Sequence, residues 1–198
     1  KEAERVIAEH NLQVQLTVPP PFYAREDYLD ALVESAKPWL EQSFDHVLFS
    51  YHGLPEQHLR SADPTRSHCL KVKDCCHVES PAHATCYRHQ VLHTTEAFAA
   101  AAGLRSDQYS IAFQSRLGRA KWLRPYTEQT LKDLAAKGVK KLLVLCPAFV
   151  TDCLETLEEI EMRGAETFKE AGGESLTLVP CLNSHPLWVE TVARWVQE

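Results

Sequence analysis

The sequence predicts an α/β fold built on a parallel β-sheet, and three observations indicate it. Short β-rich runs alternate with helical patterns several times along the chain, which is typical of parallel βα units. With 198 residues, 44% of them hydrophobic, the chain is long enough to bury one sizeable core. Unusual polar and aromatic residues also follow the predicted strands directly, at the edge where open α/β sheets bind ligands.

The first part of the chain predicts a strand, a proline break and a helix. Residues 12–16 are a strand candidate, and the prolines at 19–21 break it. A helix is expected at 25–41, because apolar side chains recur there with helical spacing. Pro38 should bend that helix or end it early, because a proline inside a helix removes a hydrogen bond. Residues 46–50 form the next predicted strand.

The rest of the chain continues the alternation. An Ala-rich helix is predicted at 84–102, and a helix at 128–137 is closed by Gly138. Residues 141–146 are the most strand-like run of all. The other predicted elements are a strand at 109–113, a helix from about 153 to 171 with a stop at Gly172-Gly173, a strand at 176–179 and a helix at 187–196.

Composition argues against several kinds of partner. Lys and Arg total 21 against 27 Asp and Glu, and the formal charge of −6 predicts no nucleic-acid partner. The apolar runs at 97–104 and 142–150 are shorter than the ~20 residues that cross a bilayer, so we expect no transmembrane segment. The chain begins at Lys1 without a signal region, so we expect a soluble, truncated chain. Its seven cysteines suit reduced thiols in the cytoplasm.

The residues that carry chemistry are a histidine and a group of glutamates. His52 directly follows a predicted strand, and Glu155 lies at the start of the helix expected from about 153. Glu155 and Glu159 are four residues apart and share a helix face. Imidazole together with carboxylate suits ferrous iron and can also accept protons. The alternatives are a structural loop histidine and a solvated acidic first turn, in which Asp152 is the N-cap and Glu155 completes a capping box.

Five sequence landmarks, in this order, resemble the ferrochelatase family, and the resemblance covers essentially the whole chain. They are SYHGLP at 50–55, QSRLGRAKWLRPYT at 114–127, LVLCPAFVTD at 143–152, DCLETLEEIE at 152–161, and Asn183. The resemblance implies a Rossmann-like chelatase fold and an enzyme of the lyase class. Its reaction would insert ferrous iron into protoporphyrin IX, the last step of haem biosynthesis.

The same resemblance assigns roles and domains. It implies that His52 and Glu155 coordinate metal and accept the pyrrole protons, with Glu159 next in an acidic line. The residues expected to contact the porphyrin are Tyr51, Gln114, Trp122 and Phe149. Residues 1–42 would be the remnant of an N-terminal chelatase domain with its linker helix, and 43–198 the C-terminal chelatase domain with a Cys-rich insertion at 66–93. Peripheral membrane contact and the oligomeric state stay open.

The Cys-rich insertion predicts a metal site of its own. Four of the seven cysteines lie between residues 68 and 93, namely Cys69, Cys75, Cys76 and Cys86. Four thiolates suit a 2Fe-2S cluster or tetrahedral zinc, and the spacing alone leaves both open. The resemblance favours a 2Fe-2S cluster. The alternatives are free thiols and a zinc site in which His68 or His77 completes the ligand set. Any bound group should matter more for stability than for metal insertion.

Two other functions are alternatives to the insertion of ferrous iron into protoporphyrin. One is a related chelatase that uses coproporphyrin or another metal. The other is a non-catalytic Cys/His module that binds an iron–sulfur cluster or zinc. Substitution of His52 separates the enzyme from the module, because only the enzyme depends on that histidine for metal insertion.

Overall fold

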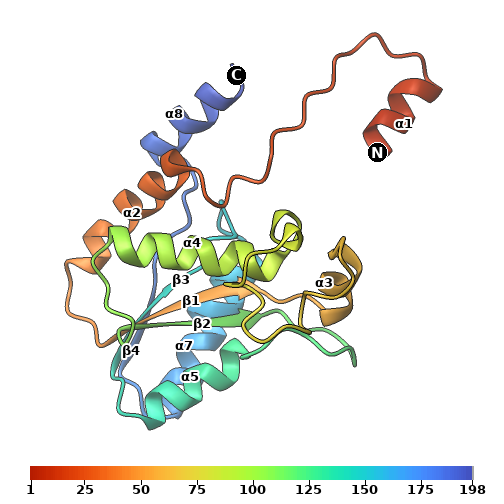
Figure 1. The fold of residues 1–198 in the computed structure, drawn as a ribbon. Coiled ribbons are helices and arrows are strands. Elements are labelled where there is room, and N and C mark those ends of the chain that lie inside the picture. The colour runs from red at the N-terminus through yellow and green to blue at the C-terminus, as the bar shows by residue number, and fades with distance from the viewer. Residues whose placement is uncertain (198) are drawn as a thin grey trace.

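The computed structural model describes residues 1–197 and has the predicted α/β architecture. Its centre is a four-stranded parallel sheet with the order β2-β1-β3-β4 (Figure 1). The strands are β1 (His46–His52), β2 (Tyr109–Gln114), β3 (Lys141–Leu145) and β4 (Ser175–Leu178). Each of the four was predicted to within two residues at either end, because short apolar runs between polar turns are typical of buried parallel strands.

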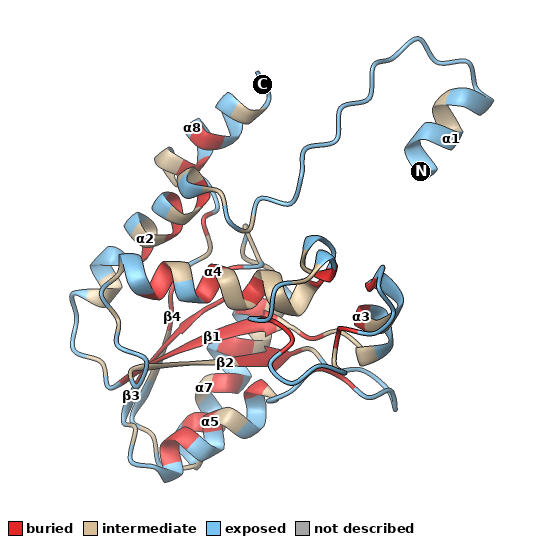
Figure 2. Ribbon diagram, viewed as in Figure 1, coloured by how far each residue is buried: buried red, intermediate tan, exposed pale blue. Residues whose placement is uncertain are grey.

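Two layers of helix bury both faces of this sheet (Figures 1 and 2). The helices α2 (Glu26–Leu40), α4 (Tyr87–Ala101) and α8 (Pro186–Trp195) share one core cluster with the side chains of Val47, Phe49 and Tyr51. The opposite cluster contains Leu48 and side chains of α5 (Thr127–Ala136) and α7 (Ala165–Glu170). Successive residues of β1 therefore point to opposite faces, as in any strand.

Helix ends follow local capping chemistry. The helix α2 runs from Glu26 to Leu40, so it extends two residues beyond Pro38 and ends one residue before the predicted boundary. The helix α4 begins at Tyr87 rather than at residue 84, because Cys86 is its N-cap and the short 3-10 helix η1 (Pro81–Ala84) precedes it. Gly138 closes α5 with a positive φ of 93°. No helix within residues 1–197 is long and apolar enough to span a bilayer.

The predicted strand at residues 12–16 is wrong. This segment lies between α1 (Glu2–Glu9), which was not predicted, and α2, and it runs extended and away from the body of the fold (Figure 1). Its apolar side chains are exposed, with Leu12 at 46% and Val14 at 58%. The alternation of apolar residues suits a strand, but a strand forms only beside a partner, and no strand of residues 1–197 pairs with this segment.

The predicted continuous helix from about 153 to 171 is replaced by three segments. A short α6 (Leu154–Thr156) leads into a π-helix, η2 (Leu157–Gly164), which is followed by α7. The expected N-cap Asp152 is also wrong, because Cys153 occupies that position. The Asp152 carboxylate instead accepts hydrogen bonds from the Cys181 backbone N–H at 3.2 Å and from the Asn183 amide at 2.6 Å. A second unpredicted helix, α3 (Glu56–Ala62), follows β1.

Candidate active site

A cleft of about 590 Å³ opens at the carboxyl ends of β1 and β2, and we call it the His52 cleft. Three predicted metal ligands, His52, Glu155 and Glu159, line it together with Gln114. The other lining residues are Phe113, Ser115, Arg116, Leu117, Tyr126, Thr127, Glu128, Gln129 and Arg163. The cleft therefore lies at the sheet edge where the sequence predicted a ligand site.

The sheet and one glycine fix the position of His52. Its Cα is paired with that of Gln114 across β1 and β2. The His52 Nδ1 lies 2.6 Å from the carbonyl oxygen of Gly53. Because a carbonyl only accepts, Nδ1 carries a hydrogen, and in the neutral ring the lone pair is therefore on Nε2. A Cβ atom at position 53 would lie 2.9 Å from the Gln114 carbonyl oxygen, so only glycine allows this close approach of the two chains.

Gln114 connects the sheet to the helix that carries the glutamates. Its side chain is buried, and its Oε1 accepts a hydrogen bond from the Ser50 hydroxyl at 2.6 Å. Its Nε2 donates to the backbone carbonyl of Glu155 at 2.5 Å. Gln114 thus fixes the start of α6 relative to β1 and β2, so its position reflects a positioning role as well as a place in the cleft wall.

Glu159 is held by a residue that the sequence analysis did not single out for a role. Ser115 donates to its carboxylate twice, from the backbone N–H at 2.7 Å and from the hydroxyl at 2.5 Å. Ser115 has a φ of 62°, a left-handed conformation that is uncommon outside glycine. Such strain at a cleft is maintained by the contacts around it. Its place directly after Gln114 in a strand-end loop was the available signal.

Glu155 is partly buried and lines the same cleft as His52. The thiol of Cys153 donates to its carboxylate and lowers the pKa of Glu155, and the nearby His52 adds a smaller effect in the same direction. Glu155 is therefore an ionised carboxylate at neutral pH. An ionised carboxylate opposite a free imidazole nitrogen is a pair that can attract a divalent cation and accept protons.

Two arginines give the cleft positive charge that the sequence analysis did not assign. The guanidinium of Arg116 lies 4.6 Å from the centre of the Tyr126 ring. Arg163 forms an ion pair with Glu158 at 2.6 Å, five residues earlier in the chain. Five-residue neighbours are brought together by the i→i+5 bonding of a π-helix. The acidic residues of this helix are therefore not all equivalent, because Glu158 pairs with Arg163 while Glu159 pairs with Ser115.

Three of the residues expected to contact porphyrin lie elsewhere. Trp122 and Phe149 flank the His52 ring, with centroid distances of 6.4 Å and 6.3 Å, but they do not line the cleft itself. Tyr51 points to the opposite face of the sheet, where its hydroxyl bonds Thr95 at 2.7 Å. It lines a separate, mostly apolar cavity of about 200 Å³. Its burial raises the pKa of Tyr51 well above the ordinary value, so it remains a neutral phenol.

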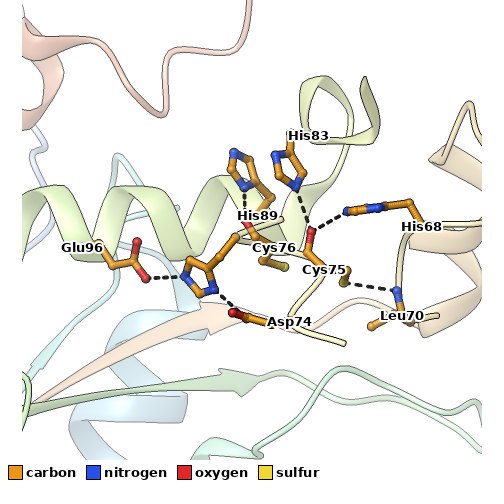
Figure 3. Close-up of polar contacts among 9 residues, drawn as sticks. His68, Leu70, Asp74, Cys75, Cys76, His83, His89 and Glu96 are labelled. Carbon is orange, nitrogen blue, oxygen red and sulfur yellow. Dashed lines mark hydrogen bonds and ion pairs between the residues drawn. The ribbon is translucent and has the colours of Figure 1, made fainter. Parts of the chain in front are cut away.

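The four cysteines of the insertion lie between α3 and α4, and Figure 3 shows Cys75 and Cys76 there. Cys69, Cys75, Cys76 and Cys86 are all buried, with 2% to 3% exposure. The Cys76 and Cys69 thiols lie within hydrogen-bond reach of Cys86, and the Cys76 contact is the main cause that lowers the pKa of Cys86 to about 5. All seven cysteines are free thiols. Among residues 1–197, no three His, Cys, Asp or Glu side chains are arranged to hold a single metal ion.

Comparison with known proteins identifies the family. The model of the family described as Ferrochelatase matches residues 1–198. The chain belongs to the ferrochelatase family. It is 64% identical over 190 residues to a ferrochelatase of Ectopseudomonas mendocina (strain ymp), which covers 96% of the chain and 56% of that relative. It is also 60% identical over 195 residues to a ferrochelatase of Stutzerimonas stutzeri (strain A1501), covering 98% of the chain and 57% of the relative.

Family membership agrees with the fold and defines what the chain contains. The parallel four-stranded sheet with helices on both faces is consistent with the Rossmann-like chelatase fold of ferrochelatases. A third relative, a ferrochelatase of Pseudomonas fluorescens (strain Pf0-1), is 59% identical over 194 residues, or 57% of its length. The chain thus spans little more than half of the ferrochelatases that it matches.

Proposed function

We propose that this chain carries the metal-insertion centre of a ferrochelatase, which places ferrous iron in protoporphyrin IX to form haem and releases two protons. The observation that carries the proposal is the His52 cleft. There the His52 imidazole, whose Nδ1 bonds the Gly53 carbonyl, and the ionised carboxylate of Glu155 line one cleft at the ligand-binding edge of the sheet. The resemblance had assigned metal coordination and proton removal to these two residues.

In this proposal each residue has a distinct part. His52 Nε2 accepts a pyrrole proton, since its Nδ1 hydrogen is committed to the Gly53 carbonyl and the ring is held in one tautomer. The Glu155 carboxylate attracts ferrous iron, because it is negatively charged and makes no ion pair within residues 1–197. Glu159, which is held by Ser115, is next along the same helix and continues the acidic path away from His52.

The porphyrin would be bound by the walls around His52. Gln114 lines the cleft, and Trp122 and Phe149 offer apolar ring surface beside the imidazole. Binding energy from the rest of the macrocycle would support its distortion, which exposes the pyrrole nitrogens to His52. We propose residues 1–42 as the remnant of an N-terminal domain with its linker helix, residues 43–198 as the C-terminal domain, and residues 66–93 as its insertion.

We also propose that Cys69, Cys75, Cys76 and Cys86 hold a 2Fe-2S cluster. The residue types suit this group, because all four thiols are buried, the thiols of Cys69 and Cys76 lie within hydrogen-bond reach of Cys86, and backbone N–H groups of Arg88 and His89 bond to the Cys86 sulfur. Such a cluster would cross-link the segment through its iron–sulfur bonds. A reducing, cytoplasmic compartment suits seven free thiols.

An anaerobic absorption experiment tests the insertion proposal. Ferrous iron and protoporphyrin are added to the purified chain, and the conversion of porphyrin bands into haem bands is followed. The same assay uses the chain joined to the remaining part of the Ectopseudomonas mendocina relative, because the chain spans 56% of that protein. Coproporphyrin replaces protoporphyrin, and zinc replaces iron, in parallel samples to define the substrates.

The matched variants are His52→Ala and His58→Ala, since His58 is exposed and lies outside the cleft. We expect haem formation with the wild type and with His58→Ala, and its loss with His52→Ala. Insertion by His52→Ala at the wild-type rate would contradict the proposal. A joined protein that binds a cluster but never inserts metal would favour the non-catalytic module.

A further inference from the structure

Three histidines surround the adjacent cysteines of the insertion without being among its proposed ligands. The Nε2 atoms of His68 and His83 lie 2.6 Å and 2.8 Å from the carbonyl oxygen of Cys75. The Nδ1 of His89 lies 2.7 Å from the carbonyl oxygen of Cys76 (Figure 3). Because carbonyl oxygens only accept, each of these three nitrogens is a donor. We call His68, His83 and His89 the histidine shell.

The histidine shell supplies hydrogen-bond donors to the Cys75 and Cys76 carbonyls, which the backbone of this loop does not provide. No backbone N–H of residues 1–197 donates to the Cys75 or Cys76 carbonyl. Two residues beside them, Leu70 and Asp74, have positive φ angles of 60° and 54°, which cost conformational free energy in side-chain-bearing residues. A loop with strained residues and without strand or helix bonding needs other contacts to keep one conformation.

The three rings come from different segments and also contact one another. His68 precedes the loop, His83 lies in η1, and His89 lies in the first turns of α4. The rings of His83 and His89 are stacked at 3.7 Å with an interplanar angle of 6°. The His68 and His83 rings meet edge to face at 5.5 Å. The shell thus connects both ends of the insertion to the turn at Cys75-Cys76.

The turn itself decides where two of the four thiols point. In an extended chain, adjacent side chains point to opposite sides, so neighbouring cysteines reach a common centre only through a fixed turn. A carbonyl that is held in direction fixes its peptide plane, and the two planes that flank a residue together fix its φ and ψ and hence the direction of its Cβ; the planes of the Cys75 and Cys76 carbonyls are those that flank Cys76. Two hydrogen bonds on the Cys75 carbonyl and one on the Cys76 carbonyl fix both planes.

We infer that His68, His83 and His89 are positioning residues that hold the Cys75-Cys76 turn so that its thiols face Cys69 and Cys86. The inference deepens the cluster assignment and rests on that proposed function for its cluster readout. It also applies to the geometry of the thiols in the metal-free protein. Outer-shell partners of metal ligands typically change metal affinity by about 10- to 100-fold, so their loss should be measurable.

A pocket lined by Cys76, His83 and His89 supplies a matched control. His93 lines it beside His83 and His89 but forms no bond to a cysteine carbonyl, and its buried Nδ1 has no hydrogen-bond partner within residues 1–197. Removing His93 changes the histidine content without touching the turn. Isosteric amides give the rescue: Gln places an N–H near the Nε2 position, and Asn places one near the Nδ1 position.

Two measurements are made on the full chain. In the first, the protein is reconstituted anaerobically with ferric iron and sulfide, and the bleaching half-life of the visible bands in air is recorded. In the second, the metal-free protein is alkylated with iodoacetamide, and the rate at Cys75 and Cys76 is read by peptide mass spectrometry. The variants are His83→Ala, His83→Gln, His89→Ala, His89→Asn and His93→Ala.

We expect His83→Ala and His89→Ala to shorten the half-life by about tenfold and to speed alkylation of Cys75 and Cys76 by about tenfold, the factor for one lost buried hydrogen bond. His83→Gln, His89→Asn and His93→Ala should stay near the wild type. Unchanged alkylation in both alanine variants, or failure of both amide variants to rescue it, would overturn the inference. A wild type without visible bands would refute the cluster proposal, while the alkylation rates would still decide the inference.

Discussion

The His52 cleft and the Cys-rich insertion are neighbouring sites that are built by different means. His52 and Gln114 are placed by strand pairing, and Glu155 is attached to the same sheet through the Gln114 amide. The four cysteines lie in a loop whose shape depends on side-chain hydrogen bonds from histidines and from Asp63, which accepts the N–H groups of His68 and Cys69 at 2.9 Å. The cleft residues are therefore positioned by the sheet, whereas the insertion depends on local contacts or a bound group.

The largest expected effect is on the rate of haem formation, with the stability of the insertion unchanged. Glu155→Gln removes the charge that attracts iron, so we expect haem formation to fall by about 100-fold. The stability and the visible spectrum of the insertion should not change, because Glu155 makes no contact with it. Stopped-flow absorption over a range of iron concentrations measures the rate. Glu161→Gln, an exposed glutamate of the same helix, should behave as the wild type, and an equal loss there would refute a specific role.

The second largest effect is on thermal stability rather than on the rate of haem formation. Cys86→Ser removes one proposed ligand and should lower the Tm of the reconstituted chain by about 5 °C, since metal-linked stability is lost. The rate of haem formation by the folded fraction should change much less. Differential scanning calorimetry of the iron-loaded and metal-free proteins measures the effect. Cys181→Ser lies outside the insertion and is the control. An equal Tm loss in that variant would contradict a specific stabilising role for the insertion.

A smaller effect tests how the cleft holds its second glutamate. Ser115→Ala removes the hydroxyl donor to Glu159 but keeps the backbone N–H, so we expect about a tenfold lower kcat for metal insertion with an unchanged porphyrin KM. Ser115→Gly removes the same hydroxyl but relieves the positive φ of 62°. Greater thermal stability of Ser115→Gly than of Ser115→Ala would be the expected result, and the reverse order would contradict strain at this residue.

The smallest effect is a pH dependence at Asp152, which lies in the loop between β3 and α6. Burial alone would raise the pKa of Asp152, but hydrogen bonds from Asn183 and Cys181 outweigh it and lower that pKa. The ionised form therefore stabilises the fold above the unfolded pKa, and this contribution is lost as the pH falls through the lowered folded pKa. Asp152→Asn should lower the free energy of unfolding by about 1 kcal/mol at pH 7 and should make that free energy fall less steeply toward acid pH. Urea unfolding between pH 3 and pH 7 measures it, and parallel curves for the two proteins would contradict it.

The sequence predicted the sheet well because apolar strands and the ligand-binding edge follow from local pattern. It could also have placed Tyr51, since the residue next to His52 in a strand must point to the other face. It could not separate an α-helix from the π-helix at Leu157–Gly164, because both keep Glu155 and Glu159 near one face. The histidine shell was also out of reach, because its contacts join loop segments that share no periodic pattern.

The strand predicted at residues 12–16 failed for a related reason. Alternating apolar residues indicate what a segment can do beside a partner strand, and no such partner exists within residues 1–197. Asp152 failed as an N-cap because its carboxylate bonds to the loop after β4 instead, a contact that spans about thirty residues and leaves no local signature.

The most direct test follows both sites in one anaerobic cuvette. The reconstituted wild type, His52→Ala and Cys86→Ser are each joined to the remaining part of the relative and scanned before and after addition of ferrous iron and protoporphyrin. The account predicts that His52→Ala keeps the cluster bands and forms no haem, whereas Cys86→Ser lacks those bands and still forms haem. Haem formation by His52→Ala at the wild-type rate would contradict the central claim that the His52 cleft is the site of metal insertion.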